Sequence, residues 1–272
     1  MTVKVKGLMT HYTRKVLATL LAVIPASSLA VAEDAASVVR QSQEAFHYAG
    51  TDMKARVKMT LIAKEGQQRL RDFTMLRKDE SGGNQRYLLY FHGPADVSGT
   101  IFMVYKYPVK DDDRWLFIPA LNLVQRVAAR DSRSSFVGSD FTYEDVSGRD
   151  LEADTHRVLR EEPLGRHKAV VVESIPTQEA DYARKLAWID QATFLPLKEE
   201  YYDQRGALYK VFTADEIREV QGVPTVTKRS MENVKSGHKT EVVFEMAAYN
   251  VGLGDEVFTE RALRRPPEKW LK

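Results

Sequence analysis

The chain has 272 residues, 43% of them hydrophobic and 29% charged, which is enough apolar material for a large buried core. This composition excludes a disordered or fibrous protein. The formal charge is only +2, and no acidic residue offsets the basic ones among the first 32 residues, so the remainder is slightly acidic. Bulk charge therefore gives no reason to expect a nucleic acid partner. The basic residues of this N-terminal stretch are Lys4, Lys6, Arg14 and Lys15.

The N-terminus is typical of a secretion signal. Its basic residues precede an uncharged run over residues 16–32, which is interrupted by Pro25 and ends in small residues. This order predicts a Sec-type signal peptide over residues 1–32, cut near Ala32, with either Met1 or Met9 as the start. The strongly apolar part, residues 16–24, is short for a membrane anchor, which needs about 20 residues. We therefore expect a protein of the Gram-negative periplasm.

The chain contains no cysteine. It therefore has no disulfide framework, no thiol nucleophile and no N-terminal cysteine that could be acylated in a lipoprotein. Its stability must come from a large hydrophobic core.

The mature part begins with one helix and continues with strands. Apolar residues at helical spacing predict an amphipathic helix over residues 34–48, which Gly50 ends. From Met53 to Ala63 the apolar residues instead occupy every second position, as in a strand with one buried face. The following turn at residues 65–67 leads into a second strand.

The same pattern continues almost to the end of the chain. It predicts about a dozen strands with short turns between them, and these indicate one large curved antiparallel sheet in a mainly β domain over residues 33–272. The later predicted strands are residues 86–91, 100–107, 114–119, 122–127, 168–174, 183–190, 196–203, 207–217, 225–234 and 240–250.

The apolar face of such a sheet needs a cover. The predicted helix and the segment of residues 129–145 are available for this, and the tail of residues 258–272 adds a short helical piece. A curved sheet closed by short helices would enclose an apolar cavity of the kind that binds hydrophobic ligands. Whether such a cavity is open or filled by side chains is not decided by the sequence.

No pattern in the chain indicates an enzyme, a metal or a cofactor. There is no G-x-S-x-G nucleophile motif, and the histidines are too scattered to form the spacing of a zinc site. Asp111, Asp112 and Asp113 lack the alternating ligands of a calcium loop and are expected at a solvated hairpin tip. We therefore expect neither catalytic residues nor bound metal.

The stretch SSFVGSDFTYEDV, residues 134–146, is the part most similar to an active site. We interpret it as a lid in which Ser139 or Asp140 caps a helix and Glu144 and Asp145 lie in its first turn. Upstream arginines are the expected partners of the carboxylates: Arg126, Arg130 and Arg133. Aromatic residues of the stretch are expected to face the sheet: Phe136, Phe141 and Tyr143.

Two blocks carry a family resemblance: DRWLFIPALNLVQRV (residues 113–127), followed by the lid stretch, and LAWIDQATFLPLKEEYYDQRGALYK (residues 186–210). Together they resemble the outer-membrane lipoprotein-sorting-like proteins of the LolA/LolB-like superfamily, in a branch often encoded beside RND-type exporters. The resemblance implies an incomplete antiparallel barrel around a helical lid, with an apolar cavity for acyl chains. It also implies that Trp115, Phe117 and the lid stretch form the signature of the branch.

The favoured function is a non-enzymatic periplasmic carrier of lipoprotein acyl chains or another lipid towards the outer membrane, with peripheral contact with membranes. An accessory of an RND-type exporter is the alternative, and a lipid hydrolase using Asp140 or Glu144 is a third. Besides the lid aromatics, the residues expected to contact the cargo follow from the alternation of the strands: Met59, Leu61, Phe102, Val104, Trp115 and Phe117. This choice of face assumes that no bulge changes the parity.

Overall fold

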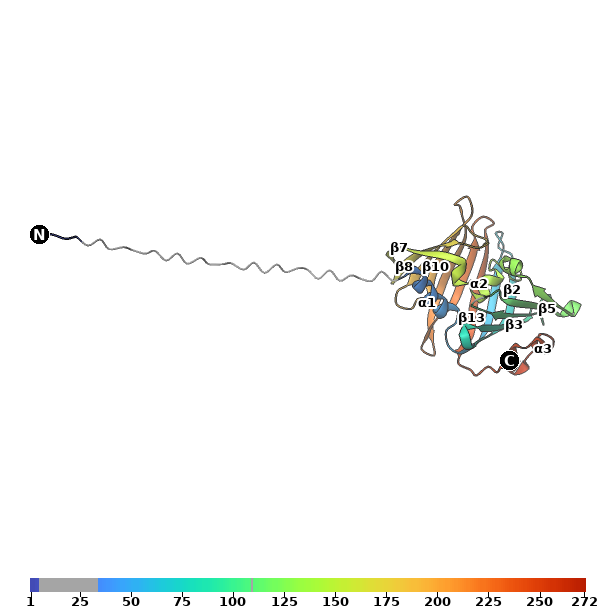
Figure 1. The fold of residues 1–272 in the computed structure, drawn as a ribbon. Helices are drawn as coiled ribbons and strands as arrows, with labels where there is room; N and C mark the ends of the chain where they lie inside the picture. The colour runs from blue at the N-terminus through green and yellow to red at the C-terminus, as the bar shows by residue number, and fades with distance from the viewer. Residues whose placement is uncertain (5–33, 109) are drawn as a thin grey trace. The chain divides into compact units, whose positions relative to one another are not determined.

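The computed structural model describes residues 1–4, 34–108 and 110–272, without the side chain of Arg130. The predicted signal peptide, apart from its first four residues, lies outside the described residues. From Asp34 onward the chain forms one thirteen-stranded antiparallel sheet and short helices (Figure 1). The strands are β1 (Asp52–Ile62), β2 (Gln68–Asp79), β3 (Gln85–Gly93), β4 (Ile101–Lys106), β5 (Asp113–Ile118), β6 (Leu123–Val127), β7 (Asp154–Leu164), β8 (His167–Pro176), β9 (Arg184–Asp190), β10 (Pro196–Tyr202), β11 (Leu208–Val220), β12 (Val223–Asn233) and β13 (His238–Tyr249). The helices are α1 (Ala35–His47), α2 (Tyr143–Ser147), α3 (Glu260–Arg264) and α4 (Glu268–Leu271).

The strand order is that of two meanders joined at the centre. It runs β6-β5-β4-β3-β2-β1-β13-β12-β11-β10-β9-β8-β7, so β1 pairs with β13 and the consecutive strands β6 and β7 form the two opposite edges. Because these edges do not pair with each other, the sheet is not closed into a barrel. The segment of residues 128–153, which connects β6 to β7, must lead from one edge of the sheet to the other.

The alternation predicted for the first strand is confirmed. Met53, Ala55, Val57, Met59 and Leu61 are all buried. The pairing of β1 with β13 shifts register by one residue between positions 56 and 57, but the extra residue lies on β13. The two faces of β1 therefore keep their identity along its whole length.

Strand β7 was not predicted. Its sequence, DTHRVLREEPL, is rich in charged residues and contains Pro163, and most of its side chains are exposed or half-buried. It is an edge strand that pairs only with β8, so it does not need the alternating apolar residues of an inner strand.

The main hydrophobic core lies on the face of the sheet that we call the lid face, where residues 134–147 and α1 pack. Figure 1 shows α1 and α2 in front of the curved sheet. Arg77, which is 1% exposed, fixes the end of α1 because its guanidinium donates to the carbonyl oxygens of Tyr48, Ala49 and Gly50. The start of α1 packs on β8 and β9 through Val38.

The opposite face, here called the outer face, carries a second core over β2, β3 and β4. There Leu76, Leu88 and Met103 pack against the C-terminal segment that includes α3. The sequence analysis assigned no cover to this face. Burial on both faces explains why β3 and β4 read as continuous apolar runs rather than as alternating ones. In the described part of the chain, none of the helices has the length and apolar composition that a membrane span requires.

The C-terminal segment is attached to the sheet by the carboxylate of Asp52, which is 4% exposed and accepts hydrogen bonds from the backbone amides of Val251, Gly252 and Leu253 at 2.6–2.9 Å. We expect Asp52→Ala to lower the free energy of unfolding by about 2–4 kcal/mol, because three backbone amides, of which that of Leu253 is buried, lose a charged acceptor. Urea denaturation followed by circular dichroism measures this change.

The matched control is Asp255→Ala, which removes an exposed carboxylate of the same segment that pairs with Lys78. This variant should unfold at the wild-type midpoint. Equal midpoints for both variants would show that the Asp52 contacts do not hold the segment.

Candidate functional site

The candidate site is the lid segment, Ser134–Ser147, together with the sheet face beneath it. The segment begins as a small hairpin in which Ser135 bridges Thr142 and the amide of Phe136 donates to the carbonyl of Phe141 at 2.8 Å. The tip is a tight turn with positive φ at both central residues, 48° at Val137 and 84° at Gly138. Glycine adopts this conformation freely, whereas it is strained for the β-branched valine.

Helix α2 follows the hairpin and is capped by Thr142, not by Ser139 or Asp140 as predicted. The Thr142 hydroxyl accepts from the Asp145 amide at 3.0 Å, and the Asp145 carboxylate accepts from the Thr142 amide at 2.8 Å. This reciprocal capping box places Glu144 and Asp145 in the first turn, as predicted. The Ser139 hydroxyl instead accepts from the Phe141 amide inside the hairpin.

The aromatic residues of the lid segment point into the main core, as expected. Phe136 is fully buried, and its ring centroid lies 5.4 Å from that of Phe102 on β4 and 6.1 Å from that of Phe91 on β3. The Tyr143 ring is 4.9 Å from Phe102. These spacings are those of favourable aromatic pairs. The lid segment is thus bound to the sheet mainly through apolar contacts.

Asp140 attaches the tip of the lid to β13. Its carboxylate accepts a hydrogen bond of 2.7 Å from the Thr240 hydroxyl and contacts His238 Nδ1 at 2.6 Å, while its amide donates to Thr240 Oγ1 at 2.9 Å. Thr240 is completely buried. This group is a tether between the lid and the centre of the sheet.

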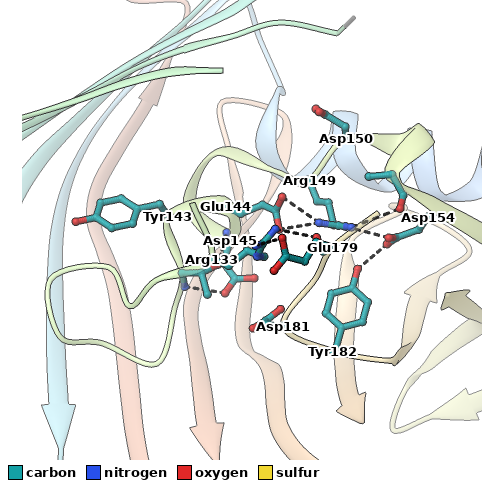
Figure 2. A network of polar contacts seen from close by, with 12 residues as sticks. Arg133, Tyr143, Glu144, Asp145, Arg149, Asp150, Asp154, Glu179, Asp181 and Tyr182 are labelled. Atoms are coloured by element: carbon teal, nitrogen blue, oxygen red, sulfur yellow. Dashed lines mark hydrogen bonds and ion pairs between the residues drawn. The ribbon is translucent and has the colours of Figure 1, made fainter. Parts of the chain in front are cut away.

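A polar network holds the base of the lid (Figure 2). The Arg149 guanidinium contacts Glu144 at 3.0 Å and Asp154 at 3.0 Å, and the Tyr182 hydroxyl donates to Asp154 at 2.5 Å. Helix α1 joins the same region, since the Gln43 side chain donates to the carbonyl of Arg149 at 2.7 Å.

Asp145 has a separate partner in Lys210 of β11, at 3.2 Å, and Lys210 also contacts Asp181 at 3.2 Å. The carboxylate partners predicted upstream are therefore wrong: Arg126 pairs with Asp113 and Arg133 with Glu179. The Arg130 side chain lies outside the described residues. The prediction took arginines that are near the lid in the sequence, but the residues that anchor the carboxylates of the lid come from strands and loops that follow it in the chain.

Burial and charge shift the pKa values of this network in different directions. Burial raises the pKa of Glu144 in spite of the Arg149 guanidinium. Burial alone would also raise the pKa of Asp145, but Lys210 and the Thr142 amide outweigh it, and the pKa lies below its ordinary value. Burial of His47 on α1, next to Arg229, lowers its pKa to about 3, so this imidazole is neutral.

Cavities of two kinds adjoin the lid and α1. Those of about 560 and 250 Å³ lie beside α1 and the base of the lid and are lined mainly by polar and charged side chains. Two small cavities lie between the lid, α1 and the sheet, and the larger of these, about 90 Å³, is lined by aromatic side chains such as Phe46 and Phe212 and by charged ones such as Asp145 and Lys185. The smaller, about 30 Å³, lies between Phe46, Met75 and Arg229. Both are far smaller than typical ligand sites of roughly 300–1,000 Å³. The space over the lid face is thus largely filled by the protein's own side chains.

Seven of the predicted cargo-contacting residues lie together in the core of the lid face: Met59, Leu61, Phe102, Val104, Phe136, Phe141 and Tyr143. Trp115 and Phe117 do not, because they pack on the outer face with the C-terminal segment. In the pairing of β4 with β5, Phe102 is opposite Leu116, so it is the even positions of β5 that share its face. The sequence does not reveal this register of β4 against β5, because the two strands are separated by a loop.

Several residues of the lid face were not among the predicted cargo contacts. Phe46, Phe212 and Met231 pack there, and Arg229 stands among them. The alternation of β11 and β12 could have indicated Phe212 and Met231, since these strands were predicted. Nothing in the sequence singles out Arg229 from other strand arginines.

Of the triple aspartate, only Asp111 is exposed in the loop between β4 and β5, as the prediction of a solvated hairpin tip requires. Asp112 is buried and contacts Arg114 at 2.6 Å and Lys106 at 3.7 Å. Asp113 pairs with Arg126. Within the described ranges, no group of three or more acidic or histidine side chains is arranged to bind a metal.

Two histidine side chains of the described residues contact hydroxyl groups: His92, whose Nε2 lies 2.8 Å from the Thr74 hydroxyl, and His156. His156 contacts the Ser174 hydroxyl at 2.9 Å through Nδ1 and the Leu151 carbonyl at 3.1 Å through Nε2. A serine that donates to an imidazole is half of a nucleophile and base pair, but here a backbone carbonyl takes the place of the orienting carboxylate. His238 contacts Asp140, and no hydroxyl of the described residues is bonded to its other ring nitrogen.

We expect Asp145→Asn to destabilise the protein by about 2–4 kcal/mol at neutral pH, because Lys210 loses one of its buried partners and the capping box loses a charge. The lowered pKa of Asp145 means that its ionisation stabilises the fold fully above the ordinary value of 3.8, and that this gain disappears as the pH falls through the lowered value. The difference between wild type and variant should therefore be constant above about pH 5 and shrink below about pH 4.

Urea unfolding at a series of pH values measures this difference. Glu179→Gln serves as the control, since its carboxylate is 81% exposed, and it should unfold like wild type. A difference for Asp145→Asn that grows towards low pH would contradict the assignment.

Comparison with known proteins places the fold. A family model whose description reads only as an uncharacterized protein matches residues 83–265, about two thirds of the chain. No curated protein matches the sequence. The chain is 28% identical to the crystal structure of an outer membrane lipoprotein-sorting protein domain from Vibrio parahaemolyticus, with a TM-score of 0.79 over 85% of this chain and 98% of that one.

Two further solved structures agree with this result. A DUF1329 family protein from Desulfovibrio piger is 28% identical, with a TM-score of 0.77 over 83% of this chain and 95% of that one. A LolA superfamily protein from Nitrosomonas europaea is 21% identical and shows the same fold, with a TM-score of 0.66 over 84% of this chain and 98% of that one. This chain therefore belongs to the family of that model, and its thirteen-stranded open sheet has the fold of the outer membrane lipoprotein-sorting protein domain, the DUF1329 family protein and the LolA superfamily protein.

Proposed function

We propose that this protein is a non-enzymatic periplasmic carrier that binds the acyl chains of a lipoprotein or of another lipid between the lid face and its two covering elements, and transfers them towards the outer membrane. The observation that carries the proposal is the way the lid face is covered. The side chains of Phe136 and Phe141 fill the space over it, but they come from a connecting segment and not from the sheet.

A carrier needs an apolar surface that is protected when no cargo is bound. The cavities between the lid, α1 and the sheet measure only about 90 and 30 Å³, so an acyl chain reaches the core of the lid face only if the lid or α1 moves. A bound chain would replace the buried rings with its own methylene groups, each worth about 0.8 kcal/mol. A chain of a dozen or more carbons therefore supplies enough free energy to displace the lid without covalent chemistry.

The relatives support the same function. The Vibrio parahaemolyticus structure is described as an outer membrane lipoprotein-sorting protein domain, and the match covers 98% of that domain. A Sec-type signal peptide would bring this chain to the periplasm, where such a carrier acts. An inner-membrane RND-type exporter is the candidate partner that we take from the sequence resemblance, with an accessory role beside it as the alternative function, and crosslinking in intact cells tests it.

The first test is direct. Protein purified from the periplasm under native conditions should carry lipid that native mass spectrometry detects. Delipidated protein should bind a fluorescent fatty acid with a saturable signal. Absence of lipid in the purified protein together with no uptake of the probe would overturn the proposal.

The second test concerns lid movement. The side chains of Asp140 and Thr240 are joined by a 2.7 Å hydrogen bond, so cysteines at these two positions lie within reach of a disulfide. Because the chain has no other cysteine, Asp140→Cys with Thr240→Cys locks the lid to β13 cleanly under oxidising conditions. We expect the oxidised double variant to lose uptake of the fatty acid probe and to regain it on reduction.

The two single cysteine variants are the controls for the loss of the Asp140 and Thr240 hydrogen bonds. They should bind the probe in both redox states. Equal uptake by the oxidised and reduced double variant would mean that cargo enters without movement of the lid tip.

A further inference from the structure

Arg229 is a cation on the lid face of β12. It lies two residues from the core residue Met231 on the same strand and is opposite Val242 of β13, another core residue. Its guanidinium is surrounded by aromatic rings: the centroid of Phe46 on α1 and that of Phe244 on β13 each lie at 4.9 Å, and that of Phe141 in the lid lies at 5.7 Å. Two of these rings belong to the elements that cover the sheet.

The guanidinium has no acidic partner. Among the described residues, neither an ion pair nor a hydrogen bond is made by Arg229, and its Nε is buried without an acceptor. Four other residues have a buried side-chain nitrogen or oxygen atom without a hydrogen-bond partner, but each of these side chains forms an ion pair: Arg71, Asp72, Arg86 and Arg114. Arg229 differs from all four in this respect.

The charge is retained in spite of its surroundings. Burial lowers the pKa of Arg229 to about 10, which leaves the group protonated at neutral pH. The nearby carboxylate of Asp145 is already engaged by Lys210 and by the Thr142 amide. Arg229 is therefore a positive charge on the lid face that pairs with no carboxylate of the described residues and that aromatic faces stabilise only in part.

The cavities place Arg229 beside the space that cargo would occupy. Arg229 lines the smaller cavity, and the Phe46 side chain lines both the smaller and the larger one. Movement of Phe46 with α1 would join the two cavities and uncover the guanidinium. The apolar side chains of Met53, Met75 and Val146 adjoin the same space.

We propose that Arg229 is the head-group site of this carrier and binds the carboxylate or phosphate group of an anionic amphiphile whose chain lies along the lid face. When α1 and the lid move, the guanidinium exchanges the rings of Phe46 and Phe141 for two oxygens of the anion. The planar donor pattern of arginine fits carboxylate and phosphate in this bidentate manner. The inference rests on the proposed function and adds the charge of the ligand to it.

The test compares three ligands with equal chains: a fluorescent C16 fatty acid, its methyl ester and an alkyl phosphate used as a competitor. Wild-type protein should bind the fatty acid at least tenfold more tightly than the ester, and the alkyl phosphate should displace it. Arg229→Met should reduce the affinity for the fatty acid about tenfold, to that of the ester, and leave the affinity for the ester unchanged. Arg229→Lys, which keeps the charge, should retain part of the preference.

The control variant is Arg218→Met, because the Arg218 guanidinium is 67% exposed on β11 and paired with Glu216. It should bind both probes like wild type. Circular dichroism melting shows whether each variant is folded, and Arg229→Gln replaces the methionine variant if that one does not fold.

The outcomes separate the two proposals. If neither the fatty acid nor the ester binds wild type, the proposed function itself is wrong. If both bind and Arg229→Met keeps the same ratio of affinities, the head-group site is wrong while the carrier stands. Displacement of the fatty acid by inorganic phosphate at the same concentration as by the alkyl phosphate would likewise overturn the inference, since the site would then recognise a free anion.

Discussion

The structure depends on one topological constraint: two strands that are consecutive in the chain, β6 and β7, form the opposite edges of a thirteen-stranded sheet. Their connection must cross the molecule, and here it crosses the lid face. The lid is therefore fixed at both ends by strands of the sheet it covers. It can lift or shift, but it cannot leave. A cover of this kind suits a surface that has to be exposed and protected repeatedly.

The forces on the lid are unevenly distributed. Its middle is held by apolar packing of Phe136 and its neighbours, whereas directional contacts are concentrated at the tip, through Asp140, and at the base, through Glu144 and Asp145. Apolar packing has no preferred partner, so an acyl chain can replace an aromatic ring at little net cost. The polar contacts fix where the lid lies on the sheet. Acidic groups that resemble a catalytic cluster in the sequence thus define the closed position.

Twelve of the strands could be predicted, because most inner strands either alternate, as β1 does, or are continuously apolar, as β4 is, and turn residues separate them. The edge strand β7 was not predicted, because it packs on few neighbours and its sequence therefore lacks alternating apolar residues. For the site, the lid aromatics were predictable from their density in a short stretch. The face of Trp115 and Phe117 was not, because register across a loop is set by pairing in space. The partners of Asp145 and the isolation of Arg229 are likewise properties of distant strands brought together.

The pairing of β1 with β13 also has a consequence for how the chain folds. Each meander can grow from local hairpins, but the two halves join only where β1 pairs with β13, from Met53 opposite Tyr249, nearly two hundred positions apart in the sequence, to Ile62 opposite Lys239. Such high contact order makes the central pairing slow relative to hairpin formation. Until the last strand has arrived, the strand that ends up in the middle of the molecule is a long, open edge with an apolar face. Because β1 is synthesised long before β13, its unpaired edge stays open to association with other chains until β13 has been made.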